Sequence, residues 1–525
     1  MSLKDNLLKE DPILYRYGSY AIVFFFAIFP LLFNLPFRIH LDLPFEGAYR
    51  LYIGQVPYRD FTMPLSYGFF IIPTICFHIF GPFLKSLLYA QAIITIIGGF
   101  SFISIFKNLK LPSVYILIAV LVFCLSYTFI YFWPWYNNTS FIYQILGIAL
   151  ILKSFYTSKK PFRYVYLTFS ILFTFLTFFT KQDYGGLAFA FGLVLVSYIA
   201  IIRRKYYLPF IYLAIYAVIA FLFIAPLLKY DFLYWFNLGQ PPHQKRFQLS
   251  DIVNEFFLNS EWEKFYFVAI VFVLIYIITK IKEFWENEHK MLLFLICMGI
   301  IIEALITKMT SHQSTGNTTY FHGFAIAFIL FGLNLNQKLS KPFNLIFLIF
   351  FIAVWWSGMY WKYASQVFHF KNKDTAINQE VTKPNQAIQW ELSEFKSLEK
   401  VKLPKETIEG IRNLKALKII DSRSNAKVLN LTELTMLAYE LNYVPMKNLP
   451  LWYHLNVGIF QNQVDTICKN IAQKEYDLVL FEEIPSLDNF FPEEIRVALK
   501  KNYKLNDSFL APRKEGDSFI EVYLP

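Results

Sequence analysis

Residues 42–64 read DLPFEGAYRLYIGQVPYRDFTMP and connect two long apolar segments. Within nineteen residues this stretch holds three carboxylates, Asp42, Glu46 and Asp60, and two arginines, Arg50 and Arg59. Apolar segments do not need such groups to enter a membrane, and charged groups among them generally serve a function. The stretch therefore predicts chemistry at a membrane surface, just outside the first apolar helix.

The composition is that of a membrane protein. Of the 525 residues, 56% are hydrophobic and 17% are charged, whereas soluble domains average about 25% charged residues. Apolar runs of transmembrane length recur between residues 21 and 361. The first run lacks a small-residue cleavage site, so we expect an uncleaved anchor. The net charge of +11 lies largely in short loops, as membrane orientation requires, and does not indicate nucleic-acid binding.

The loop charges predict the topology. Five of the loops between apolar segments hold fourteen lysines and arginines, and four other loops, longer in total, hold five. Positive charge marks the cytoplasmic side, so the first group should be cytoplasmic: 107–111, 153–163, 203–205, 280–290 and 338–341. With a cytoplasmic N-terminus, twelve spanning segments would contradict this assignment, and one segment before residue 107 is therefore expected not to span.

The best candidate for the non-spanning segment is 68–83. It is short, contains Pro73 and His78, and ends at Gly81-Pro82. We expect a helix that lies along the outer face or dips into it, which leaves eleven spanning helices. The alternative is that all twelve segments span and that the charge rule fails throughout.

The expected fold class is a membrane all-α protein, with about eleven transmembrane helices and interfacial helices in the first external loop, plus a small C-terminal α/β domain. We expect a polytopic transmembrane domain at 1–365, a linker at 366–390 and an extracytoplasmic α/β domain at 391–525. In the last part, short apolar strands alternate with amphipathic helices. Strands are expected at 417–420, 427–431, 477–481 and 519–523, and helices at 432–441, 464–473 and 492–501.

Candidate functional side chains gather on the predicted outer face. A carboxylate can take a proton from an acceptor hydroxyl, and the candidates for this catalytic role are Asp42, Glu46 and Asp60. Cationic and polar groups can bind a substrate and offset the charge of a leaving phosphate; these are Arg50, Tyr58, Arg59, Lys85, Lys181, Gln182, His243, Arg246 and His312. No Cys or His spacing predicts a metal site. A divalent metal ion as cofactor is neither required nor excluded by the sequence.

Several of these residues have a structural alternative. Arg50 and Arg59 can instead pair with Glu46 and Asp60, or reach the lipid headgroups. Surface histidines in polar loops commonly have no special role.

The lysines have an alternative of the same kind, because Lys85 and Lys181 lie where interfacial anchors usually lie. A functional role is favoured for Lys181, since Lys181-Gln182-Asp183 places three polar residues between two apolar helices. Glu303 falls inside an apolar run and is expected to be paired or near a cavity.

The first loop resembles that of GT-C glycosyltransferases, polytopic enzymes that include protein O-mannosyltransferases and lipid A aminoarabinose transferases. An acid at the end of the first helix is followed by a tyrosine, by Gly-x-x-Pro-Tyr-x-Asp-Phe and by a proline; the matching residues are Glu46, Tyr49, Gly54, Pro57, Tyr58, Asp60, Phe61 and Pro64. The end of the 68–83 helix resembles their interfacial helix, and Lys181-Gln182 followed by glycines resembles another recurrent stretch. The resemblance covers residues 18–200 well and the remainder by layout.

The resemblance implies a cell-envelope enzyme that transfers a sugar from a polyprenyl-phosphate carrier to an acceptor on the outer face, usually with inversion. The implied partners are the lipid-linked sugar, an acceptor glycan, lipid or protein, and the membrane lipids. The implied location is the cell membrane, with the C-terminal domain extracytoplasmic and periplasmic in a Gram-negative cell. The first-loop acid would act as base, and cationic groups would hold the lipid phosphate.

One residue departs from the family pattern. Many relatives carry Asp-Glu where this chain has Phe45-Glu46, so Asp42 or Glu46 must replace the missing aspartate, or the enzyme works differently. Two other functions remain open. A lipid-linked sugar transporter or flippase would more often carry its ionisable residues at mid-membrane, with repeat symmetry. A catalytically inactive scaffold of the same fold would explain Phe45.

Overall fold

The computed structural model describes residues 13–37, 41–236, 249–254, 257–258, 263–279, 281–310, 321–367, 388–419, 426–484, 490–513 and 516–525. The chain forms two compact units that interleave along the sequence. The first, called the helical unit, comprises residues 1–30, 91–223 and 245–361. The second, called the mixed unit, comprises residues 31–90, 224–244 and 362–525. Each is described by itself.

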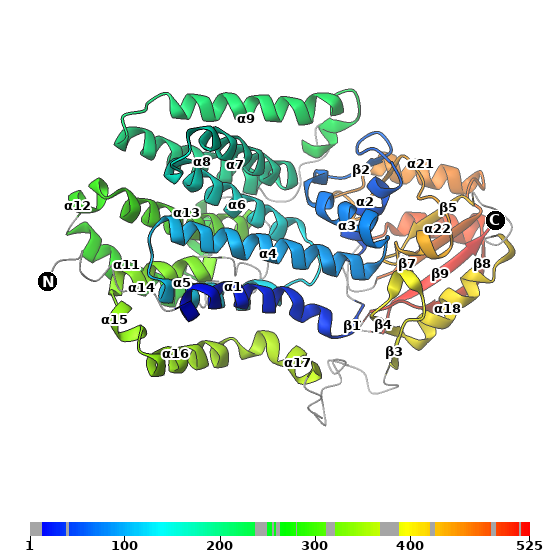
Figure 1. Cartoon of the computed structure of the whole chain (residues 1–525). Helices are drawn as coiled ribbons and strands as arrows, with labels where there is room; N and C mark the ends of the chain where they lie inside the picture. Colours follow the sequence, from blue (N-terminus) through cyan, green and yellow to red (C-terminus); the bar gives the residue numbers. More distant parts are fainter. Residues whose placement is uncertain are drawn as a thin grey trace. The chain divides into compact units, whose positions relative to one another are not determined.

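The helical unit is built from apolar helices (Figure 1). In chain order its helices are α1 (Ile13–Ile28), α4 (Leu84–Asn108, which begins in the mixed unit), α5 (Ser113–Thr128), α6 (Tyr136–Tyr156), α7 (Lys160–Thr180), α8 (Gln182–Ile202), α9 (Leu208–Ile224), α10 (Leu249–Asn254), α11 (Glu263–Ile278), α12 (Ile281–Glu286), α13 (Glu288–Thr310), α14 (His322–Leu333), α15 (Asn336–Leu339), α16 (Pro342–Trp355) and α17 (Ser357–Val367). Helices α6 and α7 pack along each other, as do α7 and α8, and α8 packs against α13.

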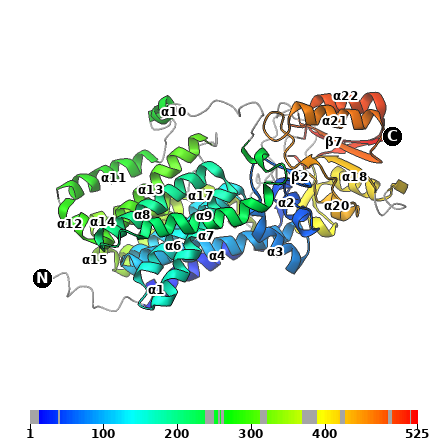
Figure 2. The same cartoon turned by 90° about the horizontal axis from the view of Figure 1, so that it is seen from above.

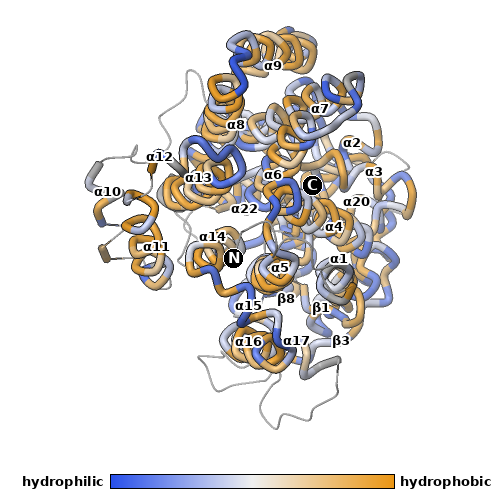
Figure 3. The backbone as a smooth tube through the Cα atoms, turned by 60° about the vertical axis from the view of Figure 1, so that its left-hand side comes forward, coloured by the Kyte–Doolittle hydropathy of each residue, from blue (hydrophilic) through white to orange (hydrophobic). Residues whose placement is uncertain are grey.

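The outward surface of this unit suits lipid rather than water. Helix α9 exposes large apolar side chains along its length, among them Phe210, Phe221 and Leu222, and α16 does the same at Phe343 and Ile346. Figure 3 shows the hydrophobic colour along both helices. Apolar surface this continuous is rare on soluble monomers and marks an interaction with another apolar phase. The chain is therefore a multi-pass membrane protein.

Within the described residues, six helices are long and apolar enough to span a membrane: Leu84–Asn108, Tyr136–Tyr156, Pro161–Thr180, Gln182–Ile202, Leu208–Leu227 and Glu288–Thr307. A seventh span is possible if the pair Pro342–Trp355 and Ser357–Ser365, bent by 82°, counts as one. Five shorter apolar helices occur, of which Tyr67–Phe80 is one. Counting both the bent pair and the other four short helices as spans would give the eleven expected from the loop charges, and that number stays a prediction.

In the mixed unit, the first loop begins with α2 (Asp42–Tyr52) and continues through β2 (Phe61–Thr62) and a 3₁₀ turn (Tyr67–Phe70) to α3 (Ile71–Phe80). A helix was expected at 68–83, and α3 confirms it. At ten residues, α3 is about 15 Å long, half of a bilayer core. It buries Cys76 and Phe77 and exposes Ile75, Ile79 and Phe80. This apolar outer face fits an interfacial helix, although its position at the membrane surface remains a prediction.

The C-terminal part of the mixed unit contains a four-stranded sheet in the order β5-β7-β9-β8, formed by Val428–Leu431, Leu478–Glu483, Phe519–Leu524 and Lys504–Leu510. Strands β5 and β7 are parallel, and the other pairs are antiparallel. Helices α21 (Gln461–Ala472) and α22 (Glu493–Asn502) cover one face, and α18 (Lys405–Lys415) lies on the other side (Figure 2). The α21 and α22 side chains Val464, Ile467 and Ile495 share one core with Val479 and Phe481 of β7.

Two smaller sheets join the first loop to the C-terminal part. Strand β1 (Leu35–Pro36) pairs in parallel with β4 (Val401–Pro404), which pairs with β3 (Trp390–Leu392). Strand β2 pairs in parallel with β6 (Leu449–Pro450). Because these strands need partners about 370–390 residues away in the chain, the first loop and the C-terminal part form one folded unit.

Most secondary structure expected in the C-terminal part is confirmed by β5, β7, β9, α21 and α22. The strand expected at 417–420 is wrong, because the Leu417 N–H bonds back to the Leu414 carbonyl and Lys418 and Ile419 are helical. The helix expected at 432–441 is reduced to α20 (Leu437–Glu440). The Thr432 hydroxyl accepts the Leu434 N–H, and such local side-chain bonds compete with a helix. The 366–390 linker lies mostly outside the described residues, and the domain boundaries stay predictions.

Candidate active site

Helix α2 carries the first-loop acids. Asp42 is its first residue and Glu46 lies one turn later, so the two side chains lie on the same helical face. An acid in the first turn and Arg50 in the last turn both complement the helix dipole. Phe45, which stands at the aspartate position of the family pattern, is fully buried and packs its ring against Phe77 of α3, with 5.2 Å between ring centroids. The position that holds an aspartate in many relatives is therefore part of the hydrophobic core here.

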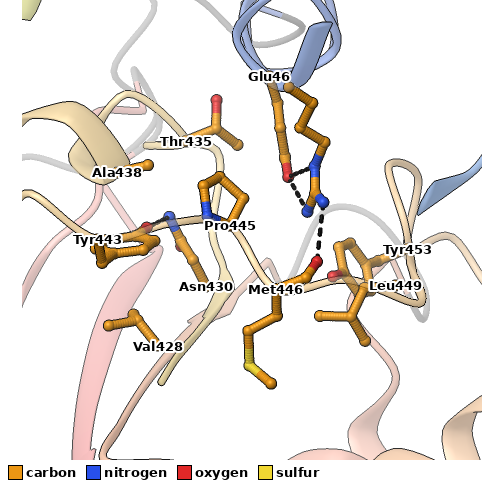
Figure 4. A pocket seen from close by; sticks show the side chains of 11 residues that line it. Glu46, Val428, Asn430, Thr435, Ala438, Tyr443, Pro445, Met446, Leu449 and Tyr453 are labelled. Carbon is orange, nitrogen blue, oxygen red and sulfur yellow. Dashed lines mark hydrogen bonds and ion pairs between the residues drawn. The ribbon is translucent and has the colours of Figure 1, made fainter. Parts of the chain in front are cut away.

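Two neighbouring hollows of the mixed unit open beside α2. The first is lined by Glu46 and Arg50 together with residues of the C-terminal part, including Asn430, Thr435 and Tyr453. Figure 4 shows the Glu46 side chain extending from α2 into this hollow. The second hollow adds Asp42 and the aromatic residues Trp452, Phe490 and Phe491. Both acids of α2 thus face residues at the carboxyl end of β5, the edge at which open α/β sheets place their ligand sites.

The buried Arg50 side chain binds three groups of the protein. Its guanidinium lies 2.7 Å from the Glu46 carboxylate and also donates hydrogen bonds to Gln55 Oε1 and to the Met446 carbonyl, both at 2.8 Å. The Arg50 side chain is 2% exposed. The pairing of Arg50 with Glu46, one of the two alternatives from the sequence, is what the structure shows. Arg50 holds α2 against the C-terminal part, and Gln55 does so as well by donating to the Pro445 carbonyl at 2.7 Å.

Asp42 has a higher pKa than an ordinary aspartate. Its carboxyl group is partly buried, and burial raises its pKa from 3.8 to about 7, with the negative charge of Glu46 adding to the rise. The Leu43 backbone N–H and the positive charge of Arg513 act in the opposite direction. A carboxyl that exchanges its proton near neutral pH has the property required of a general base. Asp42 combines this property with a place in the second hollow.

Asp60 has a different environment. Its side chain is 5% exposed and forms ion pairs with Arg59 at 2.6 Å and with Lys447 at 3.2 Å. It also accepts the Val56 N–H at 2.8 Å, which closes the turn that precedes β2. The hydrogen bond from Arg59 holds the pKa of Asp60 well below its usual range. Asp60 therefore stays ionised and shapes the loop, and the second expected arginine–carboxylate pair is also present.

Tyr58 supports the same turn. Its backbone has a φ of 64°, an uncommon conformation for a bulky residue. The buried phenol donates a hydrogen bond to the Leu65 carbonyl at 3.1 Å, and the Tyr58 carbonyl accepts the Asp231 N–H at 3.2 Å. Of the motif residues, Tyr58 and Asp60 build the loop, whereas Asp42 and Glu46 face the hollows.

The remaining expected site residues lie elsewhere. Lys85 of the mixed unit is ion-paired with Glu399. Lys181 belongs to the helical unit, between α7 and α8, and lies 3.2 Å from Asp183; Gln182 begins α8. Three further candidates lie outside the described residues: His243, Arg246 and His312. Among the described residues, no three His, Cys, Asp or Glu side chains lie close enough together to hold a metal ion.

Sequence reasoning missed the contribution of the C-terminal part. Asn430, Thr435 and Tyr453 line the hollows but lie nearly four hundred residues after α2. One usable signal existed, because Asn430 is near the end of the strand expected at 427–431, and ligands bind at that end of parallel strands.

The fold is of the GT-C type. The chain is similar to the crystal structure of ArnT from Cupriavidus metallidurans in the apo state, with 10% sequence identity, a TM-score of 0.52 and 97% of each chain covered. A second structure of that ArnT, bound to undecaprenyl phosphate, gives 12% identity and a TM-score of 0.47 over 97% of each chain. No family model and no curated protein sequence matches the chain. At these identities the likeness establishes the fold.

Proposed function

We propose that this protein is a glycosyltransferase that moves a sugar from a polyprenyl-phosphate donor to an acceptor hydroxyl on the outer face of the membrane. The observation that carries the proposal is Asp42, a carboxyl with a pKa of about 7 in a hollow beside α2. The GT-C fold supports it, and so does the undecaprenyl phosphate bound to the ArnT of similar fold.

In the proposed reaction, the oxygen of the acceptor hydroxyl bonds to the anomeric carbon of the donor sugar, and ionised Asp42 takes the proton from that hydroxyl. The bond between that carbon and the phosphate oxygen breaks, and the polyprenyl phosphate leaves with the electron pair. A single displacement of this kind inverts the anomeric configuration. Glu46 is held by Arg50, so it acts on the reaction through its charge, which adds to the effect of burial in raising the pKa of Asp42.

Lys181 is the proposed contact for the donor phosphate. A departing phosphate carries negative charge that a nearby cation stabilises, and Lys181 lies at the junction of two spanning helices, before Gln182 and a Gly-Gly pair. Asp183 holds the ammonium in place at 3.2 Å. Lys85 and Arg59 are secondary candidates for the same contact; each, like Lys181, has a carboxylate partner, but neither stands beside a Gly-Gly pair.

The C-terminal part of the chain is proposed to lie outside the cytoplasm, on the basis of the loop charges. Single cysteines at Lys205, which is partly exposed, and at Gln473, which is exposed, test this in a protein whose native Cys468 is replaced by serine. A membrane-impermeant thiol reagent applied to intact cells or spheroplasts should label position 473 and not position 205. Labelling at 205, or protection at 473, would overturn the orientation.

The test of the function itself uses cells that lack the protein. They should accumulate a polyprenyl-phosphate-linked sugar that wild-type protein removes and Asp42→Asn does not. An unchanged pool of lipid-linked sugars would contradict the proposed transferase. The buried Phe45 favours one rival, an inactive scaffold, for which Asp42→Asn would restore the cells as well as wild type.

A further inference from the structure

The helical unit contains a buried polar group of three side chains that the proposed reaction does not use. Asn137 and Gln144 belong to α6 and Glu303 belongs to α13. All three side chains are at least nine-tenths buried, with 4%, 3% and 4% of the residue surface exposed. Ionisable and amide groups inside a membrane bundle are costly and generally mark a substrate or ion site.

These side chains satisfy only part of their hydrogen-bonding capacity. Gln144 Nε2 donates to Glu303 Oε2 across the two helices, so the expectation that Glu303 is paired is confirmed. In the part of the chain that the structure describes, the other oxygens, Gln144 Oε1 and Glu303 Oε1, are buried without a partner, as are both polar atoms of the Asn137 amide. A buried polar atom without a partner is destabilising, and native proteins keep few of them unless water, an ion or a ligand completes the bonds.

The group extends inward from the helix junction that holds Lys181. Asn137 follows Tyr136, whose ring centroid lies 5.9 Å from Lys181 Nζ. Gln144 is two helical turns from Asn137 on the same face of α6 and about 12 Å along the helix from Tyr136. Buried polar side chains thus occur at successive depths of the bundle, beginning next to the proposed phosphate contact.

The buried polar atoms without a hydrogen-bond partner define the chemistry of a ligand that could bind here. Carboxylate and amide oxygens accept hydrogen bonds, and the Asn137 amide both donates and accepts. An occupant must therefore present several O–H or N–H donors. The hydroxyl groups of a sugar ring do so, whereas a polyprenyl chain has no donors.

We infer that Asn137, Gln144 and Glu303 form the subsite that holds the sugar of the lipid-linked donor. The inference rests on the proposed function, because it assigns the occupant to the donor of that reaction. In this arrangement Lys181 binds the phosphate and the three buried side chains bind the sugar hydroxyls, so they determine which donor sugar is accepted.

Binding measurements with two kinds of ligand test the subsite. Purified wild-type protein is titrated with undecaprenyl phosphate and with a panel of undecaprenyl-phosphate-linked hexoses and pentoses. At least one sugar-bearing ligand should bind more tightly than the bare carrier. Glu303→Gln keeps the side-chain volume and should lower that affinity tenfold or more, and Gln144→Leu should do the same, while both leave the affinity for undecaprenyl phosphate unchanged.

The control is Ser154→Ala, which removes a buried hydroxyl from the same helix α6 and should alter neither affinity. Equal affinities for every sugar-bearing ligand and the bare carrier in wild type would overturn the subsite, as would variants that lose both kinds of affinity equally or lose neither. Failure of wild type to bind any of the ligands is a different result, because it would refute the proposed function together with the subsite. If Gln144→Leu does not fold, the two affinities of Glu303→Gln decide between these outcomes.

Discussion

Replacement of Asp42 by asparagine separates a catalytic carboxyl from a structural one, because the two roles predict opposite signs for stability. The pKa of Asp42 is raised from 3.8 to about 7, so the folded state favours the protonated form. The stabilising contribution of that protonated form is complete below pH 4 and is lost as the pH rises through 7. For a fully buried group with this pKa, the loss of stabilising free energy would be on the order of 4 kcal/mol. About half of that loss is expected for a carboxyl that solvent partly reaches.

Asp42→Asn should therefore unfold at a higher temperature than wild type at pH 8, by a few degrees, and should match it near pH 4. Its transfer rate should nevertheless fall by about 10²–10⁴-fold, the contribution expected of a general base. Thermal unfolding followed by intrinsic fluorescence at both pH values measures the first effect, and sugar transfer by the same preparations measures the second.

The pH dependence of wild type adds an independent check. With a pKa of about 7, about one-tenth of Asp42 is ionised at pH 6 and about nine-tenths at pH 8, so kcat/KM should rise about tenfold between them. Asp42→Asn should lack this rise. A variant that is less stable than wild type at pH 8 and keeps its transfer rate and pH profile would refute the assignment of Asp42 as the base.

Three further substitutions test the roles of the charged residues around this site. Arg50→Ala leaves the Glu46 carboxylate without its buried partner and should lower the free energy of unfolding by about 3–5 kcal/mol; Arg50→Lys should recover only part, since lysine lacks the guanidinium fork. Asp60→Asn should cost about 1 kcal/mol above pH 4 and progressively less as the pH falls from there toward the lowered pKa of Asp60, where the contribution is lost. It should reduce transfer less than tenfold, and a loss as large as that of Asp42→Asn would make Asp60 catalytic. Lys181→Ala should weaken binding of undecaprenyl phosphate about tenfold or more, and Lys181→Arg less so, whereas equal titration curves would reduce Lys181 to a lipid anchor.

Much of the fold could be predicted from the sequence because its signals are local. Apolar runs predicted membrane helices, and turn residues around short apolar segments predicted β5, β7 and β9. The small sheets β1-β4-β3 and β2-β6 could not be predicted, since Leu35 and Phe61 pair with Val401 and Leu449 and each strand is too short to show a pattern. Strand β8 was missed because its first residues, Lys504–Ser508, are polar apart from Leu505 and do not alternate.

The candidate site, like the fold, could be predicted only where the signal is local. The sequence indicated the acids of α2 and foresaw both arginine pairs as an alternative, but it left open the choice between Asp42 and Glu46. That choice depends on burial and on the partner of each carboxylate. Arg50 holds Glu46 at 2.7 Å, whereas Asp42 lies against the C-terminal part, which no local pattern places near residue 42.

The most direct test of the transferase is the movement of a labelled sugar by purified protein in lipid nanodiscs. The donors are undecaprenyl-phosphate-linked sugars carrying a radioactive label, and the acceptor source is an envelope extract from cells that lack the protein. Wild type should move label from at least one donor into the acceptor fraction and release undecaprenyl phosphate in equal amount, and Asp42→Asn should do so at least 100-fold more slowly. Label that stays on every carrier with folded wild-type protein, or transfer by Asp42→Asn at the wild-type rate, would contradict the account.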